Sequence, residues 1–484
     1  MKWENLLLNE SMDGSRDWKN DYDTIVCSTL FRRLQDKAQV FPLEEDDYVR
    51  TRLTHSLEVS AIGKKLGELT FQRLKQEKKS QWFETHEEKD FADILLCAGL
   101  IHDIGNPPFG HFGEYAIREW FQAHLGELTL GGKPVTEILT EWQKEDLYHF
   151  EGNAQSLRLL SKTPYLGTME GFNLSCSVLA SIIKYPASSL DLKHGSRRGS
   201  GNKPESGRES QPGCVAVGYK KMGYYAAERE LFAEINEKTG MNGCRHPLSY
   251  LLEAADDIAY RASDLEDAMV KKVLSLPQIV EALEGCAGNW EKAEALGKHA
   301  GNLAKAEGQK LRDLYEEEVA LRHYKPELTA VQRWNQYTRE RMLTDAVDSF
   351  VKNYDSIMEG TFPGDLFDGT RSGHLIEAIS RLSEEAIYTS PTKIKAELLG
   401  RRIIDSLLHQ FMAAAVKYDT EEPMTFIEKR TIDIISTFYK SMYHTQKEGK
   451  GEAEKLYLRI LMVTDYISGM TDNYAKRLYK ELLG

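Results

Sequence analysis

The sequence predicts an all-α protein. Apolar residues recur at helical spacing along most of the chain, as Leu57, Ile62 and Leu66 do. Patterns that alternate as strands do are few and short. A chain with this periodicity packs helix on helix around a shared apolar core. The long helices that we expect cover residues 54–75, 91–103, 112–124, 247–272, 283–318, 326–354, 391–418 and 427–483.

The ends of these helices are set by helix-stopping residues. The segment 91–103 is apolar on nearly every side, which predicts a largely buried helix, and Gly105 with Pro107 and Pro108 stops it. One segment has no apolar periodicity: residues 194–213 are rich in Gly, Ser, Pro and Arg and predict a mobile surface loop. The arginines of this loop are either a nucleic-acid contact or, as we favour, part of a solvated insertion.

Composition bounds the size and class of the protein. A chain of 484 residues is long enough for one large core or for two to three modest domains. It is 41% hydrophobic and 28% charged, as soluble globular proteins are. The chain contains no apolar run near the roughly 18 residues of a membrane span, and no secretion signal follows Met1. We therefore expect no contact with a membrane.

The spacing of the cysteines indicates the cellular compartment, and the net charge argues against one class of binding partner. The six cysteines contain no CxxC pair, which argues against a zinc ribbon or a disulfide framework and favours a reducing cytoplasm. The formal net charge is -13, the opposite of what a dedicated duplex-DNA binder carries. An anionic substrate would therefore have to be met locally, by a metal ion, lysines and arginines.

A His-Asp pair, His102 and Asp103, ends the apolar segment 91–103. A charged carboxylate is costly to bury unless something pairs with it, and a metal ion is one such partner. His55 and Asp256, on two other predicted helices, complete a set of two imidazoles and two carboxylates. This set suits Mn, Mg, Fe, Co or Ni and leaves open positions for water and substrate. The alternatives are that His55 is a satisfied core residue and that His102 complements its helix dipole.

The predicted helix 247–272 carries a polar stripe in an apolar setting. Asp256, Tyr260 and Asp264 are spaced i, i+4 and i+8, so they lie along one face of this helix. Such a stripe indicates the wall of a site, and the alternative is a face exposed to solvent.

Several different short motifs are spread along the chain, at 31–35 (FRRLQ), 39–43 (QVFPL), 52–58 (RLTHSLE), 102–114 (HDIGNPPFGHFGE), 150–155 (FEGNAQ), 184–186 (KYP), 253–268 and 464–472 (TDYISGMTD). In this order the motifs resemble those of the deoxyguanosine triphosphate triphosphohydrolases of the HD-domain superfamily. The resemblance extends from about residue 28 to residue 475, and the motif at 102–114 resembles the bacterial subgroup that prefers dGTP. It implies an HD-domain helical core with an additional helical C-terminal region.

The resemblance also implies a division of the chain. We place the catalytic core in residues 1–280, with a mobile loop at about 191–215, and the C-terminal helical region in residues 281–484. The C-terminal region is expected to pack on the core and to contribute to a homo-oligomer, for which the family suggests a hexamer. Nucleotides or single-stranded DNA stimulate some family members, so we expect either as an effector here.

The resemblance implies a role for each site residue. It makes the metal ligands His55, His102, Asp103 and Asp256, with Mn or Mg as the expected ion. It makes the catalytic pair His111 and Glu114. It implies that the residues in contact with the phosphates are Arg52, Lys184 and Tyr260. The residues implied at the sugar 3'-hydroxyl are Gln39 and Asp264.

The chain departs from some relatives at two positions. Asn106 and Phe150 stand where those relatives, including the animal enzyme, carry histidines. The general acid/base role therefore falls on His111, because an imidazole titrates near neutral pH, with Glu114 one helical turn on to hold its tautomer. A helix-capping role is the alternative for His111. From chemistry alone we add Val40, beside Gln39, as an apolar wall against a ribose 2'-hydroxyl.

The expected activity is hydrolysis of dGTP to deoxyguanosine and tripolyphosphate, by water attack at the α-phosphate. Two alternatives stay open. One is another HD-domain phosphohydrolase, acting on cyclic nucleotides or on (p)ppGpp, which would share the metal ligands. The other is a regulator that senses nucleotides or single-stranded DNA, whose binding would be local and salt-sensitive because the chain is acidic.

Overall fold

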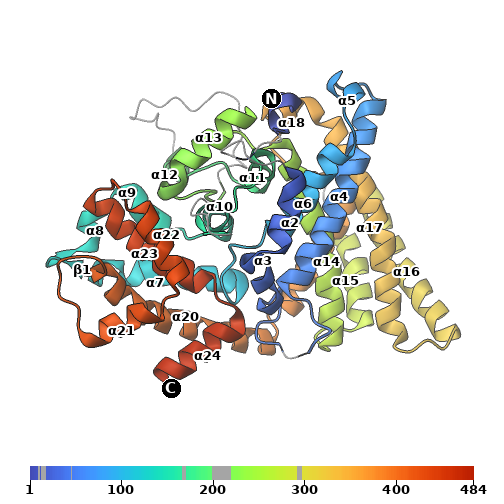
Figure 1. The fold of residues 1–484 in the computed structure, drawn as a ribbon. Helices are drawn as coiled ribbons and strands as arrows, with labels where there is room; N and C mark the ends of the chain where they lie inside the picture. The colour runs from blue at the N-terminus through green and yellow to red at the C-terminus, as the bar shows by residue number, and fades with distance from the viewer. Residues whose placement is uncertain (9–10, 12–17, 45, 166–170, 199–219, 291–296) are drawn as a thin grey trace.

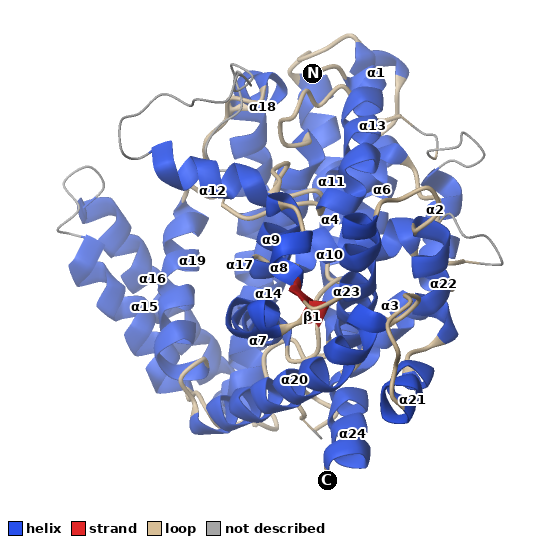
Figure 2. Ribbon diagram, turned by 90° about the vertical axis from the view of Figure 1, so that its left-hand side faces the viewer, coloured by secondary structure: helices blue, strands red, loops and turns tan. Residues whose placement is uncertain are grey.

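The computed structural model describes the chain except for residues 9–10, 12–17, 45, 166–170, 199–219 and 291–296. In the described part, the only regular elements besides helices are a hairpin of two short strands, β1 (Thr129–Leu130) and β2 (Lys133–Pro134), and two isolated bridges (Figure 2). The prediction of an all-α protein is confirmed. No described helix has both the length and the apolar character that a membrane crossing requires.

Most of the predicted long helices are present nearly as expected. They are α4 (Arg52–Gln76), α6 (Lys89–Ile101), α7 (Gly110–His124), α14 (Pro247–Val270), α17 (Pro326–Lys352) and α20 (Pro391–Lys417). The segment predicted at 283–318 begins earlier, and its described parts are α15 (Leu276–Trp290) and α16 (Gly297–Ala320).

The segment predicted as one stretch at 427–483 is divided into separate helices. Gly449 takes a left-handed φ of 71° after α22, a conformation that suits glycine, and the Thr471 hydroxyl caps the last helix by accepting from the backbone N–H of Tyr474. The four helices are α21 (Phe426–Ile434), α22 (Thr437–Gln446), α23 (Glu452–Ser468) and α24 (Asp472–Leu483).

Shorter helices connect these elements. In the N-terminal part they are α1 (Trp3–Leu6), α2 (Trp18–Val26), α3 (Thr29–Arg33), η1 (Leu34–Asp36), α5 (Trp82–Thr85), η2 (Leu125–Glu127), α8 (Val135–Ile138), α9 (Glu141–Tyr148), α10 (Gly152–Lys162) and α11 (Cys176–Ile182). Further along the chain they are α12 (Ser189–Arg198), η4 (Ala226–Glu228), α13 (Arg229–Thr239), α18 (Tyr354–Glu359), α19 (Arg371–Leu382) and η5 (Ser383–Ile387).

Close packing of α4 against α6 builds the centre of the fold. A Cβ atom on Gly99 would lie 2.5 Å from the Cα atom of Ser60, and one on Gly67 would lie 3.0 Å from the backbone nitrogen of Ala92. Glycine is therefore required where these two helices approach each other. Because α14 packs against both helices, the start of α4, the end of α6 and the middle of α14 meet at one place.

The C-terminal helices pack directly on the core. In Figure 1 the helices α20 to α24, coloured orange to red, lie beside α7, whereas α15 to α17 lie on the opposite side of the molecule. The buried Arg158 of α10 pairs with Asp465 of α23 at 2.8 Å, and Phe109 lies against Gly400 of α20. α15 runs across residue 280, and we keep the division into 1–280 and 281–484 as a proposal.

The loop expected at 191–215 begins later than predicted. Residues up to Arg198 belong to α12, because the Ser188 backbone N–H donates to Asp191 at the start of this helix and Lys193 pairs with Glu145 of α9 at 2.6 Å. Residues 199–215 of the expected loop lie outside the described residues.

One cysteine differs from what the spacing of the cysteines predicts. Among the described residues Cys27 and Cys97 are free, whereas Cys244 takes part in a disulfide that the scattered spacing of the cysteines does not predict.

Candidate active site

The turn between α6 and α7 positions the His-Asp pair and the residues that follow it. Phe109 and Gly110 both take left-handed backbone conformations, with φ of 66° and 61°. A Cβ atom on Gly105 would lie 2.1 Å from the carbonyl oxygen of Gly152, so only glycine lets the turn lie against the start of α10. Phe109 is not a glycine, and its conformation is of the strained kind that clusters at functional sites.

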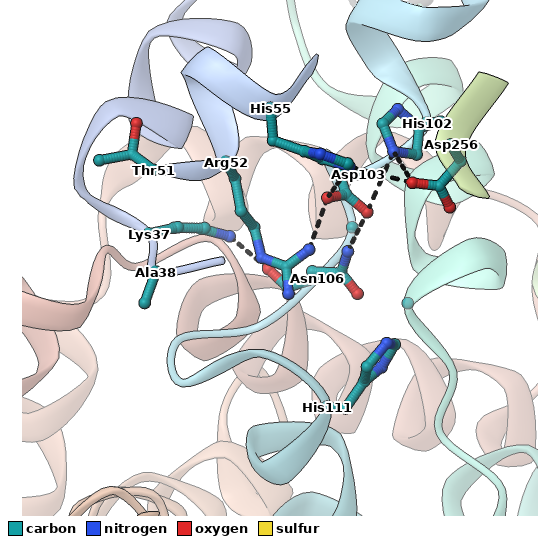
Figure 3. Close-up of polar contacts among 12 residues, drawn as sticks. Lys37, Ala38, Thr51, Arg52, His55, His102, Asp103, Asn106, His111 and Asp256 are labelled. Carbon is teal, nitrogen blue, oxygen red and sulfur yellow. Dashed lines mark hydrogen bonds and ion pairs between the residues drawn. The ribbon is translucent and has the colours of Figure 1, made fainter. Parts of the chain in front are cut away.

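Three helices bring the predicted metal ligands together (Figure 3). Ligand atoms of His55, His102 and Asp103 all lie within 4.8 Å of one another, which makes them a candidate divalent-metal site. Asp256 of α14 adds its Oδ1 atom at 3.0 Å from Nε2 of His55 and at 3.8 Å from Nε2 of His102.

The hydrogen bonds of His102 prepare it to bind a cation. Its Nδ1 lies 2.8 Å from the carbonyl oxygen of Gly99, which can only accept, so Nδ1 carries the proton. Nε2 is then the free lone pair, and it is buried without a hydrogen-bond partner among the described residues. This is the arrangement that orients metal-binding histidines in proteins. The donor set and this unsatisfied atom fit a divalent ion.

Both carboxylates of this cluster are held ionised. Burial alone would raise the pKa of Asp103, but the Arg52 guanidinium, at 2.5 Å, and the neighbouring histidines hold that pKa well below its usual range. Burial opposes ionisation of Asp256 as well, and the hydrogen bond from His55 is the largest of the effects that lower its pKa. The amide of Asn106 donates to the other oxygen of Asp103 at 2.5 Å.

His111 lies on α7, across the turn from the metal ligands (Figure 3). Its side chain is 77% exposed, and Nδ1 lies 3.1 Å from the Oε2 atom of the buried Glu114. The other oxygen of Glu114 accepts from the backbone N–H of Gly152 at 2.8 Å. Burial would raise the pKa of Glu114, but the hydrogen bond with His111 and nearby cations hold it below its usual value. Glu114 is therefore an acceptor that keeps the proton on Nδ1 and leaves Nε2 of His111 for chemistry.

A cavity of about 580 Å³ joins these groups. Its size falls in the ~300–1,000 Å³ range of small-molecule sites. Glu114 lies behind His111 and is absent from the described lining. The other site residues predicted from the sequence all line the cavity: Gln39, Val40, Arg52, His55, His102, Asp103, His111, Lys184, Asp256, Tyr260 and Asp264.

Two acceptor atoms of residues that line the cavity are buried without hydrogen-bond partners among the described residues. They are Oε1 of Gln39 and Oδ1 of Asp264. Burial raises the pKa of Asp264 to about 7, although the Tyr388 hydroxyl donates to its other oxygen at 2.9 Å. Buried acceptors are costly when unsatisfied, so these two atoms favour a ligand that donates hydrogen bonds.

Arg52 and Lys184 are two of the cations that line the cavity. Nε of Arg52 is buried without a hydrogen-bond partner among the described residues, while its Nη1 holds Asp103. Lys184 pairs with Glu253 at 2.8 Å, and that charge outweighs the effect of burial and raises the pKa of Lys184. Burial is also the main reason that the pKa of Tyr260 is raised, so its phenol stays protonated.

The described lining also includes residues that the sequence did not single out. Tyr388, Lys393 and Glu397 come from the chain around the start of α20, far along the sequence from the His-Asp motif. No residue spacing joins them to that motif. The packing of α20 on α7 places Lys393 and Glu397 at the cavity, and Tyr388 reaches it by donating to Asp264 of α14. The Glu151 carboxylate, predicted only as part of a motif, is buried and binds Arg118 at 2.7 Å and Lys221 at 3.0 Å.

Lys37 and Asp472 tie the turn to the C-terminal helices. The buried ammonium of Lys37 donates to the carbonyl oxygens of Asn106 and Ser468, the second at 2.8 Å. Burial, helped by the charge of Arg52, lowers the pKa of Lys37 to about 7. Asp472 accepts from the backbone N–H of Phe109 at 2.9 Å, and burial raises its pKa to about 6. The end of α23 and the start of α24 therefore fix the position of the turn.

We expect Lys37→Met to lower the free energy of unfolding by about 2–4 kcal/mol, because it leaves two buried carbonyl oxygens without their donor. Urea unfolding followed by circular dichroism measures this change. Lys65→Met, at an exposed position of α4, is the control and should change the stability by no more than about 0.5 kcal/mol. Equal stability of the Lys37 variant and the unchanged protein would contradict the role of Lys37.

Comparison with known proteins agrees with this architecture. Residues 52–151 match the HD domain, and residues 373–481 match the phosphohydrolase-associated domain. The chain is 41% identical to a deoxyguanosinetriphosphate triphosphohydrolase-like protein of Listeria innocua, over all of both chains. It is 32% identical to a deoxyguanosinetriphosphate triphosphohydrolase of Klebsiella pneumoniae, over 97% of this chain and 94% of that protein.

The chain belongs to the dGTPase family of HD-domain phosphohydrolases. The predicted resemblance is confirmed over the full length of the chain. The family is one of metal-dependent hydrolases, so the cluster of His55, His102 and Asp103 is the candidate site for its divalent ion. A relative from Synechocystis, also named as triphosphohydrolase-like, is 31% identical over all of this chain and 99% of its own.

Proposed function

We propose that this HD phosphohydrolase hydrolyses dGTP to deoxyguanosine and tripolyphosphate. The observation that carries the proposal is the joining of three features in one cavity. These are a cluster of divalent-metal ligands, cations for the phosphates, and unsatisfied buried acceptors for a sugar hydroxyl. The Klebsiella pneumoniae relative carries this activity in its name.

We assign the fourth metal ligand to Asp256, since its Oδ1 atom lies 3.0 Å from Nε2 of His55 and 3.8 Å from Nε2 of His102. A divalent ion held by His55, His102, Asp103 and Asp256, Mn or Mg in our proposal, supplies positive charge that stabilises the negative charge developing on the phosphate in the transition state. Arg52 adds a fixed positive charge at the same point, because its guanidinium already contacts Asp103 and keeps Nε free.

In the proposed reaction a water oxygen bonds to the α-phosphorus and the bond from phosphorus to the 5'-oxygen breaks. The 5'-oxygen leaves on deoxyguanosine with one proton, and the three phosphates leave together. His111 exchanges this proton through Nε2, because Glu114 holds the proton on Nδ1. Asn106 and Phe150 stand where some relatives carry histidines, which leaves His111 as the proton carrier.

Gln39 and Asp264 bind the sugar 3'-hydroxyl in this proposal. A 3'-hydroxyl that donates its proton to Oδ1 of Asp264 satisfies an acceptor that is otherwise buried without a partner among the described residues, and Gln39 lines the same cavity. Lys184 and Tyr260 are assigned to the phosphates, as both line the same cavity.

Product analysis tests the proposal. The purified protein is incubated with each dNTP and each rNTP, with Mn or Mg, and the products are resolved by ion-exchange chromatography. Tripolyphosphate from dGTP is the expected result. A monophosphate or pyrophosphate product would indicate another HD-domain phosphohydrolase, and binding of single-stranded DNA or nucleotide without turnover would indicate a regulator.

Val40 supplies a test of the preference for deoxyribose. It is buried and lines the cavity next to Gln39, where it would contact a 2'-hydroxyl. We expect Val40→Ala to raise kcat/KM for GTP relative to dGTP by about tenfold, the scale of one or two methyl groups in a specificity pocket. Val49→Ala removes the same atoms from a buried valine outside the described lining and should leave the ratio unchanged. If kcat/KM for GTP relative to dGTP is unchanged in the Val40 variant, Val40 does not exclude the 2'-hydroxyl.

A further inference from the structure

A second cluster of metal-binding side chains lies at the other end of α7 and α20. His124 is the last residue of α7, and Asp405 and His409 stand one helical turn apart on α20. One ligand atom from each of the three lies within 4.8 Å of the others. In the part of the chain that the structure describes, this is the one group besides the candidate active site that meets this criterion. Thirteen residues of helix, about 20 Å, separate His124 from His111.

The imidazole of His124 is already oriented. Its Nδ1 lies 2.8 Å from the Oε2 atom of Glu127, which accepts the Nδ1 proton and leaves the lone pair on Nε2. A carboxylate on the far nitrogen is the usual partner of a metal-binding histidine, since it fixes the ring and makes it more basic. The two imidazole rings have centroids 4.4 Å apart and are inclined at 67°, so they meet edge to face rather than stacking.

His409 changes its tautomer and one hydrogen bond when it acts as a ligand. The indole N–H of Trp120 donates to its Nδ1 at 2.8 Å, so the proton now lies on Nε2. The carbonyl oxygen of Asp405 lies 2.9 Å from the same Nδ1. When the proton moves to Nδ1, this carbonyl accepts it, the Trp120 indole gives up its hydrogen bond to Nδ1, and the lone pair of Nε2 becomes free for a cation.

We propose that His124, Asp405 and His409 bind one zinc-class divalent ion between α7 and α20. Two imidazoles and one carboxylate are the ligands that Zn²⁺ takes in proteins, with water in the remaining position. Mg²⁺ prefers oxygen ligands, and this cluster offers a single carboxylate, so it would hold Mg²⁺ weakly. The three side chains are 28%, 38% and 47% exposed, so an ion reaches them without unfolding.

The site would join the two helices that border the cavity. α7 carries His111 near its start, and α20 carries Lys393 and Glu397 on the cavity. The helices are already in contact along their length, from Gly113 beside Ile404 to Trp120 bonded to His409. An ion at their far end restricts their relative movement and stabilises the folded chain as its concentration rises above the Kd.

Zinc stoichiometry tests the proposal independently of the catalytic activity. The full-length protein is stripped with a chelator, dialysed against Zn²⁺ and measured by elemental analysis. We expect H124A and H409A each to hold one equivalent per chain less than the unchanged protein. H149A is the matched control, because His149 is 43% exposed and its Nδ1 lies 3.4 Å from a carboxylate oxygen of Glu145. Equal zinc content in H409A and the unchanged protein would overturn the proposal.

Chemical protection gives a second test that needs no variant. Histidines of the unchanged protein are labelled with diethyl pyrocarbonate and quantified by peptide mass spectrometry. With Zn²⁺ tenfold above its Kd, labelling of His124 and His409 should fall about tenfold. Mg²⁺ should leave their labelling unchanged, and labelling of His149 should not respond to either ion. Labelling of His124 and His409 that is indifferent to Zn²⁺ would exclude the site even if the variants failed to fold.

Discussion

His111→Ala is expected to lower kcat for dGTP by about 10²–10⁴-fold, the contribution of a general acid or base, while metal content stays normal. The physical reason is the position of the imidazole. It lines the cavity, and its Nδ1 is held by Glu114, but it contacts none of the four proposed metal ligands in the hydrogen bonds and ion pairs described. Steady-state kinetics with saturating metal, together with elemental analysis, measure both quantities.

A variant of Glu114, the hydrogen-bond partner of His111, supplies a control with a smaller expected effect on kcat. Glu114→Gln keeps the size of the side chain and removes the charge that favours a proton on Nδ1, so it should lower kcat less than His111→Ala does. His149→Ala, at a half-exposed histidine outside the described lining, should leave kcat unchanged. Full turnover by His111→Ala in the presence of metal would contradict the acid/base role of His111 and favour the alternative, a helix-capping role.

Asp256→Ala is expected to abolish turnover by removing a metal ligand. Oδ1 of Asp256 lies 3.0 Å from Nε2 of His55, and loss of this carboxylate leaves two imidazoles and only one anion. We expect the affinity for Mn²⁺ to fall by more than the ~10–100-fold that loss of an outer-shell partner costs. Equilibrium dialysis with elemental analysis measures the affinity, and circular dichroism checks that the variant is folded.

Asp257→Ala is the matched control for Asp256. Asp257 is its neighbour in the chain and pairs with Arg261 at 3.1 Å, and burial raises its pKa to about 7. A carboxyl that is partly protonated near neutral pH is a poorer ligand, so this variant should keep its metal. A full metal complement in Asp256→Ala, with loss of metal in Asp257→Ala, would move the ligand to Asp257.

Local patterns predicted the helices well and their ends less well. The helix at 91–103 is recognised because its residues are apolar on nearly every side, and Gly105 stops it. The stretch at 427–483 looked continuous, because a left-handed residue such as Gly449 interrupts the backbone without interrupting the apolar pattern. The start of the loop at 191–215 was misjudged, since α12, which packs against α9, covers Ser189–Arg198.

The sequence by itself determined the fold class and the family of this protein, and with the family the chemistry of an HD phosphohydrolase. His55, His102, Asp103 and Asp256 could be selected in advance as candidate metal ligands, because a metal site needs particular donor atoms and few residue types supply them. The family followed from the order of the motifs, and the full-length comparisons bear it out.

The tertiary structure alone decided how the rest of the chain serves that chemistry. Lys37 and Asp472 hold the active-site turn, and Tyr388 reaches Asp264, through contacts between segments more than a hundred residues apart. His124 meets His409 in the same way. No local spacing records such pairs, because burial and hydrogen bonding act between residues that become neighbours only when the helices pack.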